Sequence, residues 1–180
     1  LQGVMGKYFA TEQGFDDDVS MAISDHYLPV GINSPVPKKP ISIAVSLIDK
    51  IDMLVGFFGI NEKPTSSKDP FALRRNAIGL LRIIIENKLS VQLKDLINYS
   101  IVIYEEQNVK FTNKSATKEI LIFLKDRFKN LLKDKKIRSD IIEAAEGSQT
   151  GHDFLVLYKK CLIVNKNISK DICKNIIGTY

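Results

Sequence analysis

The stretch ISIAVSLIDKIDMLVGFFGI, residues 41–60, is apolar on almost every side of a helix. Its only charged residues are Asp49, Lys50 and Asp52. A helix that is apolar all round is normally surrounded by other elements of the protein. We therefore predict that residues 41–60 form a central, buried helix and that the fold is built around it.

The segments on both sides also have helical patterns. Before the central helix, the apolar spacing predicts two short helices, the second of which starts at three aspartates that suit a helix N-terminus and stops at Pro29. Residues 30–40 carry a glycine and three prolines and are expected to be an extended loop. Further helices are predicted at residues 70–88, 90–106, 115–135, 139–147, 152–164 and 168–177. No strand pattern is visible, so the predicted fold class is all-α.

The composition sets broad limits on function. A chain of 180 residues with a net charge of +5 can bury one core, and it leans toward an acidic partner such as RNA, although a merely solvated surface accounts for the charge equally well. The two cysteines, Cys161 and Cys173, lack CxxC spacing and are expected to be buried thiols in a reducing compartment. No apolar run reaches the ~20 residues of a membrane span, because charged residues interrupt each candidate, and no signal peptide is visible. Since the first residue is Leu1 and not Met, we expect a piece of a longer chain. The expected location is the cytoplasm.

Residues 63–75, KPTSSKDPFALRR, combine a polar loop with the start of a helix. Asp69 can accept hydrogen bonds from free backbone N–H groups, and Pro70 suits the first helical position. Cations, hydroxyls and a helix N-terminus together form a surface suited to phosphate. The candidate RNA-binding residues from this region are Lys63, Lys68, Arg74, Arg75 and Arg82.

Gly79 lies between two of these arginines on the same helical face, since Arg75 and Arg82 are seven residues apart. A glycine costs about 1 kcal/mol relative to alanine in an exposed helix, so a close contact is expected to compensate. That contact is either a phosphate or another part of the backbone. In the structural alternative the arginines pair with carboxylates, and the candidates are Asp49, Asp52 and Glu86.

Residues 118–138 are the most basic part of the chain, with eight lysines and arginines against three acidic residues. One face of the predicted helix is apolar and is expected to join the core. A concentrated basic face is typical of proteins that bind the RNA backbone, and a solvated lysine face is the alternative. Lys125 and Lys129 complete the set of candidate RNA contacts.

Metal-binding and catalytic residues are sparse. Asp49 and Asp52 share a helical face and are weak candidates for metal ligands, although we favour a helix that is less buried than it looks, with Asp49 paired to a cation. The two histidines, His26 and His152, are isolated from other ligands, and His26 is expected to close a helix C-terminus. No catalytic residue is predicted, because no nucleophile elbow, P-loop or dinucleotide motif is present.

Several segments, taken in order, resemble the β subunit of the bacterial two-subunit glycyl-tRNA synthetase. The most specific is residues 63–75, and similar segments are found at residues 1–10, 25–29, 49–59, 122–128 and 137–142. Ser66 and Ser67 stand where the family usually places a glycine next to a hydroxyl residue. Ile48 and Asn76 also depart from the family, which typically has alanine and a small apolar residue at those positions.

The resemblance implies both an architecture and a role. Residues 1–106 would form an HD-domain-like helical bundle, and residues 107–180 a helical extension toward an absent anticodon-binding domain. In that family the α subunit activates glycine with ATP, and the β subunit binds tRNA in an α–β hetero-oligomer. The expected partners are glycine tRNA and the synthetase α subunit. ATP and Mg²⁺ would serve the whole enzyme, with no cofactor held by this piece, which would be inactive alone.

Two other interpretations stay open. The residues around Asp49 also resemble the last metal-ligand segment of an HD-type phosphohydrolase, but the ligand set is incomplete because Asp25-His26 has the reverse order of the His-Asp dyad. Alternatively, the chain is a purely structural subunit-contact module that never touches RNA.

Overall fold

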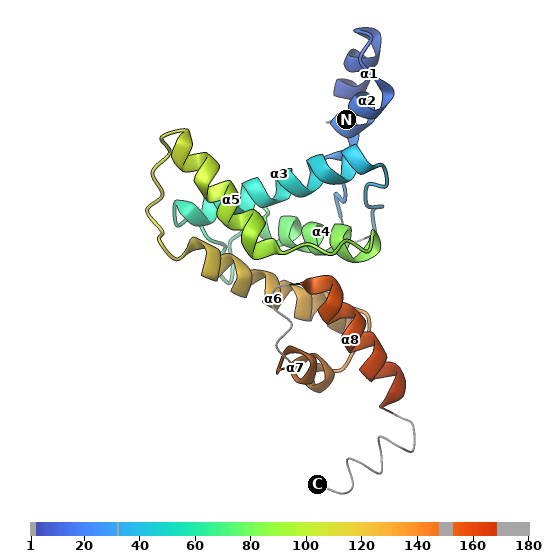
Figure 1. Cartoon of the computed structure of the whole chain (residues 1–180), viewed down its shortest axis with the longest axis vertical. Coiled ribbons are helices and arrows are strands. Elements are labelled where there is room, and N and C mark those ends of the chain that lie inside the picture. Colours follow the sequence, from blue (N-terminus) through green and yellow to red (C-terminus); the bar gives the residue numbers. More distant parts are fainter. Residues whose placement is uncertain (1–2, 32, 148–152, 169–180) are drawn as a thin grey trace, which may run out of the picture.

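The computed structural model describes residues 3–31, 33–147 and 153–168, and these ranges contain eight α-helices and no strand (Figure 1). The prediction of an all-α fold is therefore confirmed. The helices are α1 (Val4–Glu12), α2 (Asp17–Asp25), α3 (Pro40–Gly59), α4 (Leu73–Glu86), α5 (Leu93–Glu106), α6 (Ala116–Asp134), α7 (Ser139–Gly147) and α8 (Phe154–Asn167).

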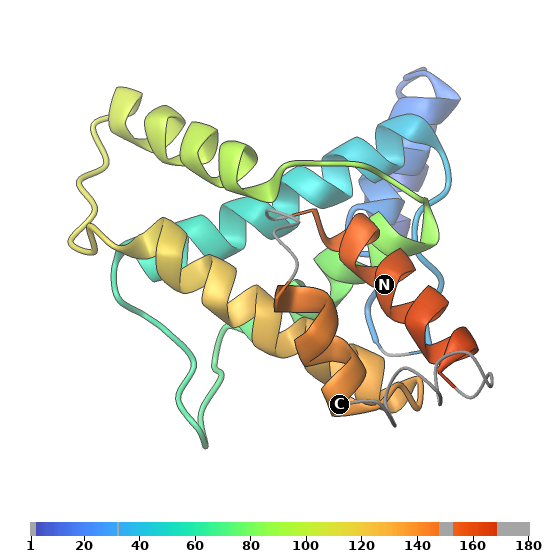
Figure 2. The ribbon, with the colours of Figure 1, turned by 60° about the horizontal axis from the view of Figure 1, so that its bottom comes forward.

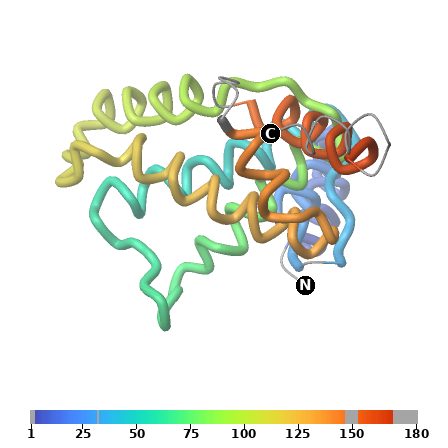
Figure 3. Tube along the Cα trace, turned by 90° about the horizontal axis from the view of Figure 1, so that it is seen from below, coloured from blue at the N-terminus to red at the C-terminus, as the bar shows by residue number. Residues whose placement is uncertain are grey.

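The α1–α2 pair lies at one end of the long axis of the molecule, and α7 and α8 lie toward the other (Figure 1). The connection between α3 and α4 projects away from the helices, as two views agree (Figures 2 and 3). In the ranges that the structure describes, no helix is both long and apolar enough to cross a membrane.

α3 is central, since it contacts α2, α4, α5 and α6. The prediction that it is buried on every side is nevertheless wrong. One side, which includes Leu54, Val55 and Phe58, is buried, whereas Ile41 and Ile48 are exposed on another. Its neighbours cover only part of the helix, so an all-round apolar sequence leaves an uncovered apolar stripe.

The core is formed mainly by α3, α4 and α6, and it continues into α7 and α8. Leu80, Leu81 and Ile84 of α4 are buried, together with Leu124 and Phe128 of α6. This single cluster runs across the expected division between residues 1–106 and 107–180, which stays a prediction. Cys161 is a buried free thiol whose pKa is raised by burial, while Cys173 lies outside the described residues.

The connection between α5 and α6 closes over the C-terminus of α3. The backbone N–H groups of Thr112 and Asn113 both donate to the carbonyl of Gly59, each at 3.0 Å. A Cβ at Gly59 would collide with the ring of Phe111. Glycine therefore allows the close contact that attaches this connection to α3, and this contact helps to fix where α5 ends and α6 begins.

Two helix starts differ from their predicted positions. α4 begins at Leu73 rather than at Pro70, because Ala72 is left-handed with φ 52°. Asp69 still accepts hydrogen bonds from the backbone N–H groups of Leu73 and Arg74, at 2.8 and 3.0 Å, as its predicted capping role requires. α5 begins at Leu93, three residues after Ser90.

Ser90, at which the second of these helices was predicted to begin, has a partner that is distant in sequence. Its hydroxyl donates to Asp153, at 2.8 Å. Asp153 in turn accepts hydrogen bonds from the backbone N–H groups of Leu155 and Val156 at the start of α8. Ser90 therefore links the start of α8 to the turn between α4 and α5.

Candidate nucleic-acid interface

The loop that begins at Lys63 is attached to α6 by an ion pair. The Lys63 ammonium lies 2.7 Å from a carboxylate oxygen of Glu119. The same carboxylate accepts a hydrogen bond from the side chain of Asn113, at 2.8 Å. These contacts, that with Lys63 first, lower the pKa of Glu119. Lys63 thus has a carboxylate partner within the chain.

Arg74 organises the same loop. Its guanidinium donates to the carbonyls of Thr65 and Lys68, and it lies 3.8 Å from the Asp69 carboxylate. By contrast, the side chains of Lys68 and Arg75 are exposed and have no hydrogen bond or ion pair to other described residues. Of the cations predicted in this loop and the first turn of α4, only these two are available to a ligand.

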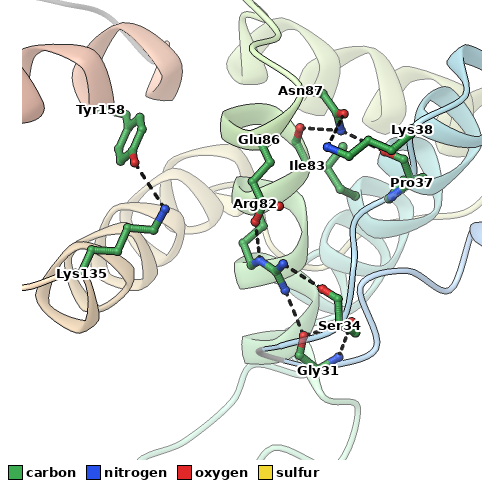
Figure 4. Close-up of polar contacts among 10 residues, drawn as sticks. All are labelled: Gly31, Ser34, Pro37, Lys38, Arg82, Ile83, Glu86, Asn87, Lys135 and Tyr158. Carbon is green, nitrogen blue, oxygen red and sulfur yellow. Dashed lines mark hydrogen bonds and ion pairs between the residues drawn. The ribbon is translucent and has the colours of Figure 1, made fainter.

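Arg82 holds the segment after α2 against α4 (Figure 4). Its guanidinium donates to Glu86 at 2.7 Å, to the carbonyl of Gly31 at 3.0 Å and to the carbonyl of Ser34 at 2.8 Å. The side chain is only 12% exposed. Arg82 therefore has the internal partners that the structural alternative requires, and Glu86 is one of them.

Gly79 compensates for its low helix propensity by a close contact within the protein. A Cβ there would lie 3.0 Å from Cε of Lys50 and 3.4 Å from the ring of Pro29. Lys50 is 2% exposed and donates to the His26 carbonyl at 3.0 Å and to the Ser46 hydroxyl at 3.1 Å. Burial lowers the pKa of Lys50. Gly79 thus makes room for a buried lysine.

In the described part of the chain, the two weak metal candidates, Asp49 and Asp52, belong to no cluster that could hold a metal ion. The described residues hold no group of three or more His, Cys, Asp or Glu side chains that could bind a metal. His26 follows the last turn of α2, with its ring Nδ1 2.8 Å from the carbonyl of Ile23, so it closes this helix as expected. His152 lies outside the described residues. Nothing in this geometry supports the phosphohydrolase interpretation.

A basic groove of about 540 Å³ lies between α5 and the first half of α6, and we call it the α5–α6 groove. Four lysines line it, and the remaining lining is polar or apolar without a carboxylate: Lys94, Lys114, Lys118, Lys125, Asn98, Ser115, Thr117, Leu121 and Ile122. None of the four lysines has an ion pair or side-chain hydrogen bond to the described part of the chain. Thr117 donates to Asn98 across the two helices at 2.8 Å.

The sequence comparison identifies the family. A family model described as Glycyl-tRNA synthetase beta subunit matches residues 1–146. The chain belongs to this family. It is 38% identical over 180 residues to the glycine–tRNA ligase beta subunit of Rhodospirillum centenum, covering 100% of this chain and 25% of that protein.

Two further relatives give the same result. The beta subunit of Clostridioides difficile is 39% identical over 171 residues, which are 95% of this chain and 24% of the relative. That of Rickettsia canadensis is 41% identical over 180 residues, which are 100% of this chain and 26% of the relative. The chain thus spans about a quarter of the length of these relatives, and the family match includes the whole α5–α6 groove.

The fold brings only some of the predicted RNA-binding residues together. Lys125 lies in the α5–α6 groove, whereas Lys129, four residues later, lies 3.2 Å from the carboxylate of Glu146 on α7. Lys94, Lys114 and Lys118 were not among the predicted residues. Lys114, Lys118 and Lys125 are spaced by four and seven residues, which is the spacing of one helical face and could have marked them as a set. Lys94 comes from another helix, so only the tertiary structure adds it.

Proposed function

We propose that this chain is part of the β subunit of a glycyl-tRNA synthetase and that it binds and positions tRNA through the α5–α6 groove. In this role it breaks no bond, and its contribution to aminoacylation is to hold the RNA. The observation that carries the proposal is a set of four lysines that line one groove and have no carboxylate partner in the part of the chain that the structure describes.

Several ammonium groups around one groove repel one another, and a polyanion that lies among them removes that repulsion. RNA phosphates supply such a polyanion, and the counterions released on binding make the affinity strongly salt-dependent. The side chains of Asn98, Ser115 and Thr117 add hydrogen-bonding groups suited to phosphate or the ribose 2′-hydroxyl. The groove also includes the N-terminus of α6, where an anion is favoured.

The wider assignment rests on the family. The relatives are named as beta subunits of glycine–tRNA ligase. We propose that the partners are glycine tRNA and an α subunit in a hetero-oligomer, and that the complex works in the cytoplasm. ATP and Mg²⁺ would be used by the whole enzyme, and no cofactor role is proposed for the residues of this chain.

The decisive experiment measures binding of glycine tRNA at several salt concentrations to the chain and to the double variant Lys94→Glu/Lys118→Glu. We expect the variant to bind at least about tenfold more weakly at low salt. Because each neutralised phosphate contributes roughly 0.7 to 0.9 to the slope of log K against log salt, that slope should fall by about 1.5.

A matched control carries the same change of charge elsewhere. Lys159 and Lys166 are exposed on α8, outside the groove, so Lys159→Glu/Lys166→Glu should weaken binding much less. If both double variants behave alike, only net charge matters and the groove is not the site. If no tRNA binds at low salt, the tRNA proposal fails and the subunit-contact interpretation replaces it.

A further inference from the structure

The uncovered side of α3 forms an apolar groove with α2, which we call the α2–α3 groove. It has a volume of about 450 Å³ and is lined by Val19, Ala22, Ile23, His26, Ile41, Val45, Ile48, Asp49 and Asp52. Four β-branched side chains along it are strongly exposed: Val19 by 40%, Ile41 by 44%, Val45 by 40% and Ile48 by 66%. A single exposed isoleucine needs no explanation, but several that line one groove mark a contact surface.

The pattern along α3 fits another helix. Ile41, Val45 and Ile48 follow one another at steps of four and three residues, which places them on one stripe over two turns. An apolar stripe of this kind packs against the apolar stripe of a second helix, ridge into groove. Helices that bind in apolar grooves use anchors with the same spacing.

The charges around the stripe indicate the sign of the charge that a partner should carry. Asp49 and Asp52 line the α2–α3 groove, and no lysine or arginine does. The buried ammonium of Lys50 lies 4.0 Å from Asp49 and also donates to the His26 carbonyl and the Ser46 hydroxyl, so it offsets only part of the charge of Asp49, whose side chain is 42% exposed. Asp52 interacts with the neutral hydroxyl of Tyr104 and forms no ion pair with the described residues. The nearby Lys39 already pairs with Asp18 at 2.7 Å.

The net charge of the first part of the sequence is also negative. Residues 1–52 contain seven acidic and four basic residues, a net charge of −3, whereas the whole chain is at +5. An acidic, apolar surface repels RNA phosphates and anionic lipid headgroups alike.

We infer that the α2–α3 groove docks a basic amphipathic α-helix of another polypeptide. Its apolar side chains would cover the stripe of Ile41, Val45 and Ile48, and its lysines or arginines would lie against Asp49 and Asp52. This surface is separate from the proposed tRNA site, since the two share no lining residue. Either proposal can therefore fail without the other.

The test uses a synthetic helix-forming peptide of about 18 residues, with leucines at positions i, i+4 and i+7 and lysines beside them. A second peptide carries glutamate in place of each lysine. Titration against the 180-residue chain, followed by fluorescence anisotropy, should show binding of the lysine peptide. The glutamate peptide should bind at least about tenfold more weakly.

Variants locate the binding. Ile48→Ser should weaken binding of the lysine peptide at least about fivefold. Ile163→Ser replaces an isoleucine that is 61% exposed on α8 and should leave binding unchanged. Asp49→Asn/Asp52→Asn should reduce the salt dependence of binding, and Asp95→Asn on α5 should not. Both substituted isoleucines are mainly exposed, so the folded state should survive in both variants.

Three results would overturn the inference. Equal binding by Ile48→Ser and Ile163→Ser would place the peptide elsewhere. Equal binding of the two peptides would show that the acidic residues play no part. Light scattering that finds a dimer of the chain, lost in Ile48→Ser, would make a second copy the occupant. Loss of tRNA binding in Lys94→Glu/Lys118→Glu, with the peptide still bound, would confirm that the two surfaces are distinct.

Discussion

Two basic regions of this molecule differ in what their cations contact. Between residues 63 and 82, Lys63, Arg74 and Arg82 all have acceptors within the chain. In the α5–α6 groove, four lysines lie together, and their ammonium groups have no acceptor among the described residues. The first set of charges stabilises the fold and the second is available to a ligand, although the sequence is basic in both places.

The difference comes from what packs nearby. Arg82 lies against the segment that follows α2, where the carbonyls of Gly31 and Ser34 are free to accept hydrogen bonds. A guanidinium satisfies several such acceptors at once. Within the described ranges no comparable segment packs over the α5–α6 groove, and Asp95, although next to Lys94 in sequence, does not line it.

The largest effect is expected from a pair of arginines on α4. Arg82→Ala removes a nearly buried guanidinium, which takes away the side-chain donor of the Ser34 carbonyl, one of the donors of the Gly31 carbonyl and the ion pair with Glu86, so unfolding free energy should fall by about 2–4 kcal/mol. Arg75→Ala, seven residues earlier and exposed, should change it by less than about 0.5 kcal/mol. Urea unfolding of both variants checks this. Similar losses of unfolding free energy in the two variants would contradict the distinction between cations that have partners within the chain and cations that are free to bind a ligand.

The next effect concerns the contact that joins the α5–α6 connection to α3. Gly59→Ala places a methyl group against the Phe111 ring, which should destabilise the protein by about 1–3 kcal/mol and weaken tRNA binding, because the adjoining groove changes shape. Gly31→Ala is the control, since a Cβ there meets open space. Thermal unfolding and tRNA titration of both variants are the measurements. Undisturbed tRNA binding in a destabilised Gly59→Ala variant would show that the groove does not depend on this contact.

The sequence predicted what depends on local pattern. The capping contacts of Asp69, the start of α6 after Ser115 and the apolar face of α6 follow from neighbours a few residues away. Glu86, four residues from Arg82, was among its predicted partners, but the carbonyls of Gly31 and Ser34 are about fifty residues away in sequence, so no local pattern reveals them. The burial of α3 was overestimated for the same reason, because only the packed neighbours determine which apolar faces are covered.

The smallest effect is expected when Lys63 loses its partner within the chain and its ammonium becomes free to bind RNA. Glu119→Gln removes the carboxylate that pairs with Lys63 on α6, next in sequence to Lys118 of the α5–α6 groove, and glycine tRNA should then bind about two- to fivefold more tightly at low salt. The pair is partly exposed, so the loss of stability should stay below about 1 kcal/mol.

The same pair should make stability depend on pH. Since the pKa of Glu119 is lowered in the folded state from its ordinary 4.5, the stability that this carboxylate contributes is present above pH 4.5 and is lost as the pH falls below that value. Urea unfolding between pH 3 and 7 should therefore show the two proteins converging at the acid end. Unchanged tRNA affinity in Glu119→Gln would mean that Lys63 lies too far from the RNA path, and the distinction between the two basic regions would then be one of position as well as of pairing.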